Sequence, residues 1–157
     1  MKAIILIFLI AIGEAGFSQS KDSTAIDNLL RALSSQQFTY SYSLKSVPKF
    51  VKRGIKKIEG RKFRAADKGK KFNATDVSLH PARPFRRIIY IARSGNLFVI
   101  TYEQGGFRTP YKSKFVHCDK KKISSIVTLQ VPYHETIDSL EVALARKENV
   151  VITGPFD

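Results

Sequence analysis

Basic side chains dominate one stretch of the sequence, and theirs is the chemistry that the sequence indicates most strongly. Residues 49 to 71 contain eleven lysines and arginines against two carboxylates, and Phe50 and Phe63 lie among them. Cations interleaved with aromatic rings can bind the phosphates of nucleic acids or of lipid headgroups. The candidate anion-binding residues are Lys52, Arg53, Lys56, Lys57, Arg61, Lys62 and Arg64.

The same stretch has a simpler interpretation as a solvated helix. Val51, Ile55 and Ile58 share one face of a helix that should end at Gly60, and the lysines and arginines fall on the opposite face. Such a helix would pack its apolar face on a sheet and use its charges only for solubility. The sequence leaves both interpretations open.

A second candidate site combines aromatic and imidazole groups. Tyr102, Tyr111 and His117 fall on predicted strands and could line a pocket of a hydrolase-like or ligand-binding protein. No nucleophile elbow, phosphate loop or zinc-protease motif accompanies them. Cys118 follows His117 on the same predicted strand, so their side chains point to opposite faces. We therefore expect a buried Cys118 thiol that has no catalytic role.

The histidines give no indication of a metal. Structural zinc sites usually have paired ligands at short spacing, and His80, His117 and His134 stand far apart in the sequence. We therefore predict neither a metal nor a cofactor. The tripeptide Asn73-Ala74-Thr75 matches a glycosylation acceptor, which matters only in a eukaryotic secretory pathway.

The first residues have the features of a signal peptide, which we assign to residues 1–18. Lys2 precedes an apolar run over residues 3–12, and Gly16 and Ser18 supply the small residues that cleavage requires. The run is too short to span a bilayer as a helix, which takes about 20 residues. We expect a single exported domain over residues 19–157, soluble in the periplasm or the medium after cleavage.

The net charge of +14 points to an anionic partner. Export favours an anionic polymer of the envelope or an anionic membrane surface, and no specific nucleic acid is predicted. The resulting hypothesis is a non-enzymatic binding module for such a partner. Two alternatives stay open, namely the pocket protein described above and an envelope module that binds another protein.

The fold is expected to centre on a hairpin between Arg86 and Gln104. Gly95-Asn96 is the predicted turn, which would place Ile91 opposite Ile100 and Ile89 opposite Tyr102. Both faces of this hairpin are apolar, so both should be covered.

Other patterns predict an N-terminal helix with Ile26 and Leu33 on its apolar stripe, and a helix capped by Thr136 that ends near Asn149. The fold class is α+β, a mainly antiparallel sheet of five to seven strands in a meander of hairpins, flanked by N- and C-terminal helices. A small β-barrel or half-barrel is the alternative. The remaining strands are expected at Phe38–Leu44, Arg61–Ala65, Lys70–Asp76, Tyr111–Cys118, Ile123–Val131 and Val150–Ile152.

Overall fold

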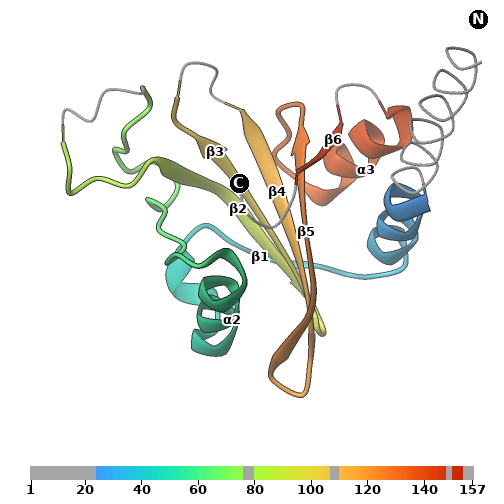
Figure 1. The fold of residues 1–157 in the computed structure, drawn as a ribbon. Helices are drawn as coiled ribbons and strands as arrows, with labels where there is room; N and C mark the ends of the chain where they lie inside the picture. The colour runs from blue at the N-terminus through green and yellow to red at the C-terminus, as the bar shows by residue number, and fades with distance from the viewer. Residues whose placement is uncertain (1–23, 76–79, 107–109, 148–149, 154–157) are drawn as a thin grey trace, which may run out of the picture. The chain divides into compact units, whose positions relative to one another are not determined.

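The computed structural model describes residues 24–75, 80–106, 110–147 and 150–153 (Figure 1). The predicted signal peptide lies outside these residues. The chain divides into two compact units, of which the first ends at Ser35 and the second begins at Gln36. The first contains a helix over residues 24–34, and the second contains the sheet and the other helices. None of the described helices combines the length and the hydropathy needed to span a bilayer.

The N-terminal helix has the apolar stripe that its sequence predicts. Ile26 and Leu33 are buried, and Leu29 and Leu30 are half-buried. Ser34 Oγ donates a hydrogen bond to the carbonyl of Leu30, 2.9 Å away, in the last turn.

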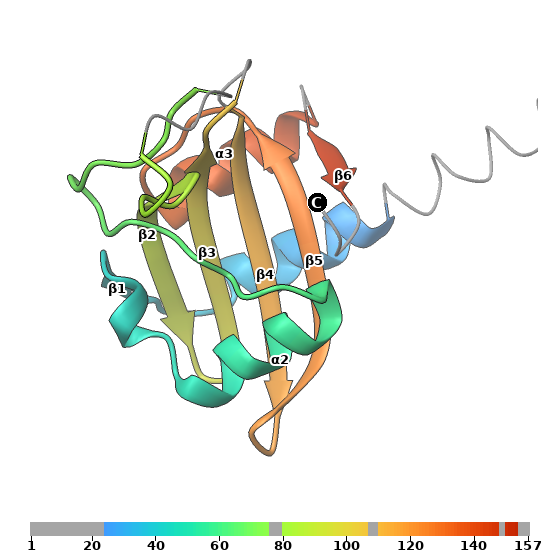
Figure 2. The same cartoon turned by 60° about the vertical axis from the view of Figure 1, so that its left-hand side comes forward.

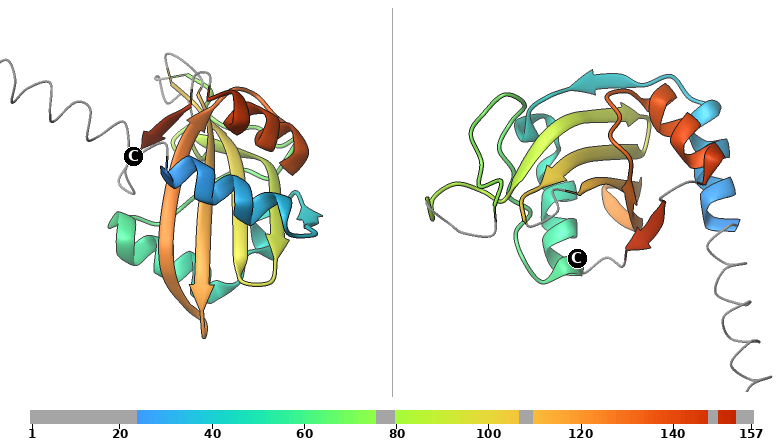
Figure 3. Two further views of the ribbon diagram at one scale, coloured as in Figure 1. Left: turned by 90° about the vertical axis from the view of Figure 1, so that its right-hand side faces the viewer. Right: turned by 90° about the horizontal axis from the view of Figure 1, so that it is seen from above.

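The second unit is built on one antiparallel sheet with the strand order β1-β2-β3-β4-β5-β6. Each strand pairs with its neighbours in sequence, which confirms the predicted α+β meander of hairpins. The sheet curves, but it is open, with β1 and β6 at its edges, so it is not a closed barrel (Figure 3). The strands are β1 (Thr39–Ser41), β2 (Arg86–Ser94), β3 (Leu97–Gln104), β4 (Tyr111–Asp119), β5 (Lys122–Val131) and β6 (Val151–Thr153).

The central hairpin of β2 and β3 has the predicted turn and one unpredicted irregularity. Ser94 pairs with Leu97 around the turn, and Ile91 lies opposite Ile100, as expected. A register shift between Ile88 and Tyr90 then places Ile88, rather than Ile89, opposite Tyr102. The prediction for Ile89 was wrong because a β-bulge inserts one extra residue and exchanges the faces beyond it.

Helix α2 (Lys49–Glu59) packs on one face of the sheet, and α3 (Ile137–Arg146) lies on the opposite face (Figure 2). Val51 and Ile55 of α2 are fully buried, as predicted. The third buried residue of this helix is Glu59. Ile58, which we expected in that role, is only half-buried.

Gly54 explains how α2 comes so close to β5. A Cβ atom at this position would lie 2.5 Å from Cδ1 of Ile123. Only a residue without a side chain fits this spacing unless Ile123 moves, which accounts for a glycine inside a helix. Gly60 ends the helix in a left-handed conformation with φ of 71°, as the sequence predicts.

Helix α3 confirms the predicted cap. The backbone N–H of Ser139 donates to the hydroxyl oxygen of Thr136. In return, the backbone N–H of Thr136 donates to the hydroxyl oxygen of Ser139. The stripe of Ile137, Leu140 and Leu144 is buried. The helix ends at Arg146, earlier than expected, and Asn149 lies outside the described residues.

Three predicted strands are shorter or absent. Only Thr39–Ser41 of the expected strand Phe38–Leu44 forms a strand, because the chain then turns into the 3-10 helix η1 (Leu44–Ser46). Residues 61–65 and 70–75 form no strand, and their link to the sheet is a bridge between Ala66 and Arg87. Asp76 lies outside the described residues. The turn expected between the two segments is present, with Gly69 at φ of 78°.

The acceptor tripeptide at Asn73 is folded into the protein. Asn73 is 6% exposed, and its side-chain amide donates to the carbonyls of His80 and Arg83 at 2.9 and 3.0 Å. A Cβ at Gly105 would come within 1.9 Å of the Asn73 carbonyl oxygen, so the two backbones are in close contact. The folded protein therefore does not present this amide for glycosylation.

Candidate functional site

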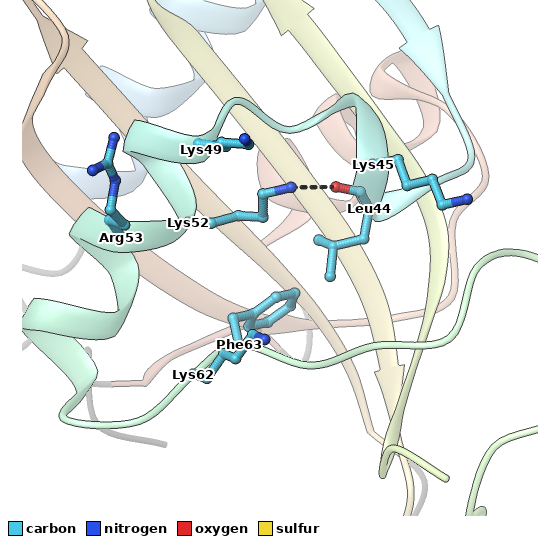
Figure 4. A pocket seen from close by; sticks show the side chains of 7 residues that line it. All are labelled: Leu44, Lys45, Lys49, Lys52, Arg53, Lys62 and Phe63. Carbon is cyan, nitrogen blue, oxygen red and sulfur yellow. Dashed lines mark hydrogen bonds between the residues drawn. The ribbon is translucent and has the colours of Figure 1, made fainter. Parts of the chain in front are cut away.

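A cavity of about 710 Å³ opens beside α2 (Figure 4). Three elements build its walls, namely η1, the N-terminal half of α2 and the chain just after Gly60. Its described lining residues comprise five cations, one aliphatic residue and one aromatic residue. They are Leu44, Lys45, Lys49, Lys52, Arg53, Lys62 and Phe63.

The η1 wall is fixed by a carboxylate from a distant loop. Asp67 Oδ1 accepts from the backbone N–H of Leu44 at 2.8 Å, and Oδ2 accepts from the Ser43 hydroxyl at 2.9 Å. The Ser43 hydroxyl oxygen in turn accepts from the backbone N–H of Lys45. These bonds cap η1 as a side chain caps a helix, so Leu44 and Lys45 are held in place.

The α2 wall follows from helical spacing. Lys49, Lys52 and Arg53 are three and four residues apart, so they share one side of the helix. Lys52 Nζ reaches across the cavity and donates to the Leu44 carbonyl at 3.4 Å (Figure 4). The first turn contains no acidic residue and no side-chain cap, so the positive end of the helix dipole adds to the charge of these cations.

The aromatic wall is packed against the sheet. Phe63 is 3% exposed and packs edge-on against Tyr102, with ring centroids 5.2 Å apart. The guanidinium of Arg86 lies 5.0 Å from the centre of the Phe63 ring. Phe63 is thereby wedged between the sheet and the cavity.

The cavity collects some of the cations that the sequence singled out. Lys52, Arg53 and Lys62 line it, whereas four others are exposed and outside the described lining. Lys45 and Lys49 join the cavity although they were not among the predicted site residues. Lys49 belongs to the same basic stretch, but Lys45 carries no sequence signal because η1 was not predicted. The predicted residues outside the cavity are Lys56, Lys57, Arg61 and Arg64.

The alternative site of tyrosines and a histidine does not converge. Tyr102 is fully buried on the α2 face, and its partner across the ladder is Lys112. Tyr111 precedes Lys112 on β4, so its side chain points to the other face, where it packs against Tyr133. His117 is exposed near the far end of β4, where its Nδ1 lies 2.9 Å from the Ser124 hydroxyl.

Cys118 is buried, as predicted, while its neighbour His117 is exposed. Burial raises the pKa of the Cys118 thiol, and the positive charge of Arg93 opposes that rise. A thiol that stays protonated is a poor nucleophile.

A buried ion pair lies beneath the C-terminal end of α2. Lys114 Nζ is 2.6 Å from Glu59 Oε1, and both side chains are 1% exposed. The ammonium also donates to the hydroxyl of Thr128 at 2.6 Å. Burial lowers the pKa of Lys114, and the nearby Glu59 carboxylate opposes that shift. Glu59 Oε2 is buried without a hydrogen bond from the described residues.

A neutral polar cluster lies on the α3 face. His134 Nδ1 donates to the Pro132 carbonyl at 2.8 Å, which leaves Nε2 to accept from the Ser113 hydroxyl at 3.0 Å. Thr101 Oγ1 lies 2.9 Å from the same hydroxyl oxygen. A serine beside an imidazole resembles a nucleophile with its base. Ser113 and Thr101 are fully buried and His134 is 3% exposed, so no substrate reaches the cluster. Burial lowers the pKa of His134.

No group of three or more potential metal ligands occurs within the part of the chain that the structure describes. No protein-family model, no curated protein and no solved structure matches this chain.

Proposed function

We propose that this protein is a non-enzymatic module that binds an anionic partner through the cavity beside α2. The partner class is a polyanion of the cell envelope or an anionic membrane surface. One observation supports the proposal above all others, because the described lining of the cavity contains five cations and no carboxylate. The proposal includes export, which rests on the signal peptide predicted at residues 1–18.

The electrostatics of the cavity favour anion binding. Four of its five cations are exposed, and none of these four forms an ion pair with a carboxylate of the described residues. Like charges held together repel, so a bound anion gains attraction and relieves that repulsion. Bound counterions are released when the ligand arrives, which makes the affinity strongly dependent on salt.

Two variants with equal charge test the proposal. The first replaces four cations of the cavity (K49Q/K52Q/R53Q/K62Q), and the second replaces the four predicted cations outside it (K56Q/K57Q/R61Q/R64Q). Binding of inorganic polyphosphate and of phosphatidylglycerol vesicles is measured across a salt series. We expect the cavity variant to lose about tenfold or more in affinity, because hydrogen bonds to charged groups contribute about 1.5–3 kcal/mol each.

The second variant is the control, since it lowers the net charge by the same amount. It should retain most of the affinity and most of the salt dependence of the wild type. Equal losses in both variants would show that bulk charge, and not the cavity, attracts anions. Circular dichroism and thermal melting check that both variants are folded. Seven of the eight replaced cations are exposed, and exposed charges contribute only about 0–1 kcal/mol each to stability.

A further inference from the structure

The cavity changes from charged to apolar between its rim and its floor. Lys45, Lys49 and Lys62 are exposed, so their ammonium groups lie at the solvent side. Phe63 is 3% exposed, and Leu44 is half-buried against the hydrophobic core. Figure 4 shows the side chain of Leu44 and the ring of Phe63 facing the same space.

Lysine side chains strengthen this gradient. A lysine lays its methylene stem along apolar surface and keeps its ammonium in water. Lys52 is half-buried, and its ammonium donates to the Leu44 carbonyl inside the cavity. The walls between rim and floor are therefore partly hydrocarbon. The volume of about 710 Å³ falls in the range of small-molecule sites, about 300–1,000 Å³.

We infer that the cavity takes an amphipathic anion, a phosphate- or carboxylate-headed molecule with one alkyl chain, which enters chain first. The chain lies against Leu44 and Phe63, and the head remains among the rim cations. The inference rests on the anion binding of the proposed function, and at the same cavity it replaces the polymer and the membrane surface by a single-chain amphiphile as the ligand. It disfavours a uniformly charged polymer, because such a polymer would leave the apolar floor in contact with water.

The polarity gradient also fixes the direction of entry. A headgroup that docks from an intact bilayer would meet the rim cations, but its chain would stay in the membrane and the floor would stay empty. A ligand that fills both zones must bring its chain into the protein. The expected source is therefore a dispersed single-chain lipid rather than a lipid held in a bilayer.

A chain-length series tests this inference with the wild-type protein. Calorimetric titration compares inorganic phosphate with ethyl, butyl, hexyl and octyl phosphates, each below its aggregation concentration. We expect the affinity to rise about fourfold per added methylene until the floor is filled, because each buried methylene contributes a nearly constant transfer free energy. Octylphosphocholine, whose head has no net charge, should bind more weakly than octyl phosphate.

A pair of truncations locates the chain. Leu44→Ala should reduce the gain from ethyl to octyl phosphate about tenfold or more and leave inorganic phosphate unaffected, because the change removes several carbon atoms from the floor. Ile126→Ala is the matched control, since Ile126 is also half-buried against the same core but lies outside the described lining. It should leave the chain-length series unchanged.

The outcomes separate the inference from the proposed function. A flat chain-length series, with the cavity variant still weaker than its control toward polyphosphate, would overturn the inference and leave anion binding intact. Binding to phosphatidylglycerol vesicles without binding to dispersed octyl phosphate would replace chain-first entry by surface docking. No difference between the two charge variants, together with a flat series, would reject both proposals. If Leu44→Ala fails to fold, the wild-type series still decides.

Discussion

The two faces of the sheet bury polar groups in contrasting ways. The α2 face encloses an ion pair between Lys114 and Glu59. The α3 face encloses the uncharged cluster of Thr101, Ser113 and His134. Ser113 and Lys114 are neighbours on β4, so adjacent residues of one strand serve the two arrangements. Full charges inside a protein require a close partner, whereas neutral groups require only hydrogen bonds.

This contrast explains how α2 acquires a purely cationic outer surface. Glu59 is the one carboxylate of the helix, and it points inward to Lys114. The five cations of the helix thus have no carboxylate of their own helix beside them on the solvent side. The charge arrangement inside the α2 face therefore leaves the proposed binding surface outside it purely cationic, and the α3 face makes no such contribution.

The largest effect is expected from breaking the ion pair. Lys114→Met leaves Glu59 buried without its cation, and we expect a loss of about 3–5 kcal/mol in the free energy of unfolding. Adding Glu59→Leu should restore most of that loss, because the double variant buries no unpaired charge. Urea denaturation of the two single variants and the double variant measures the coupling. If the losses of the two single variants simply add in the double variant, the two side chains are not coupled and the ion pair does not stabilise the fold.

The α3 face should instead respond to acid. Burial lowers the pKa of His134 in the folded protein, so between that value and the unfolded value near 6.5 the unfolded chain binds more protons. Stability is then fully present above about pH 6.5 and falls as the pH decreases, by at most about 1.4 kcal/mol per pH unit. Urea midpoints from pH 7.5 to 5 give this slope. His134→Gln should flatten it, and an unchanged slope in that variant would assign the acid response to other groups.

The smallest effect concerns the β4–β5 turn, which supports both faces equally. Lys120 and Lys121 have positive φ values of 44° and 65°, a conformation that suits Asn-Gly much better than two lysines. Lys120→Asn with Lys121→Gly should raise stability by about 1 kcal/mol. The gain should be the same in the wild-type, Lys114→Met and His134→Gln backgrounds, as measured by thermal melting. A gain confined to one background would couple the turn to one face.

The sheet was predictable because its signals are local. Apolar runs on both sides of Gly95-Asn96 specify the central hairpin, and the Thr136 cap specifies the start of α3. The bulge at Ile88 had no such signal, because register depends on packing against the rest of the sheet. Phe38–Leu44 alternates as a strand does, yet the bonds from Asp67 turn its end into η1 instead.

The cavity was predictable only in part, because some of its residues have a local sequence signal and others reach it through long-range contacts. The density of charge identified Lys52, Arg53 and Lys62, since α2 and its C-terminal neighbour are continuous in sequence. Lys45 and Leu44 come to the cavity through contacts with a loop more than twenty residues away, and no local pattern encodes that approach. The burial of the Glu59 side chain likewise depends on its ion pair with Lys114, which lies on a different element.

The short edge strands have a consequence for self-assembly. β6 covers only Thr128–Gln130 of β5, and no described strand pairs with the outer side of residues 122–127. Unpaired strand edges are templates on which other chains add in aggregates, and charged residues, lysine above all, discourage such addition. Lys120, Lys121 and Lys122 stand at the start of this open edge. We therefore expect the strained lysine turn to discourage such addition, and its replacement by Asn-Gly to make the fold more stable but its open edge more prone to aggregate.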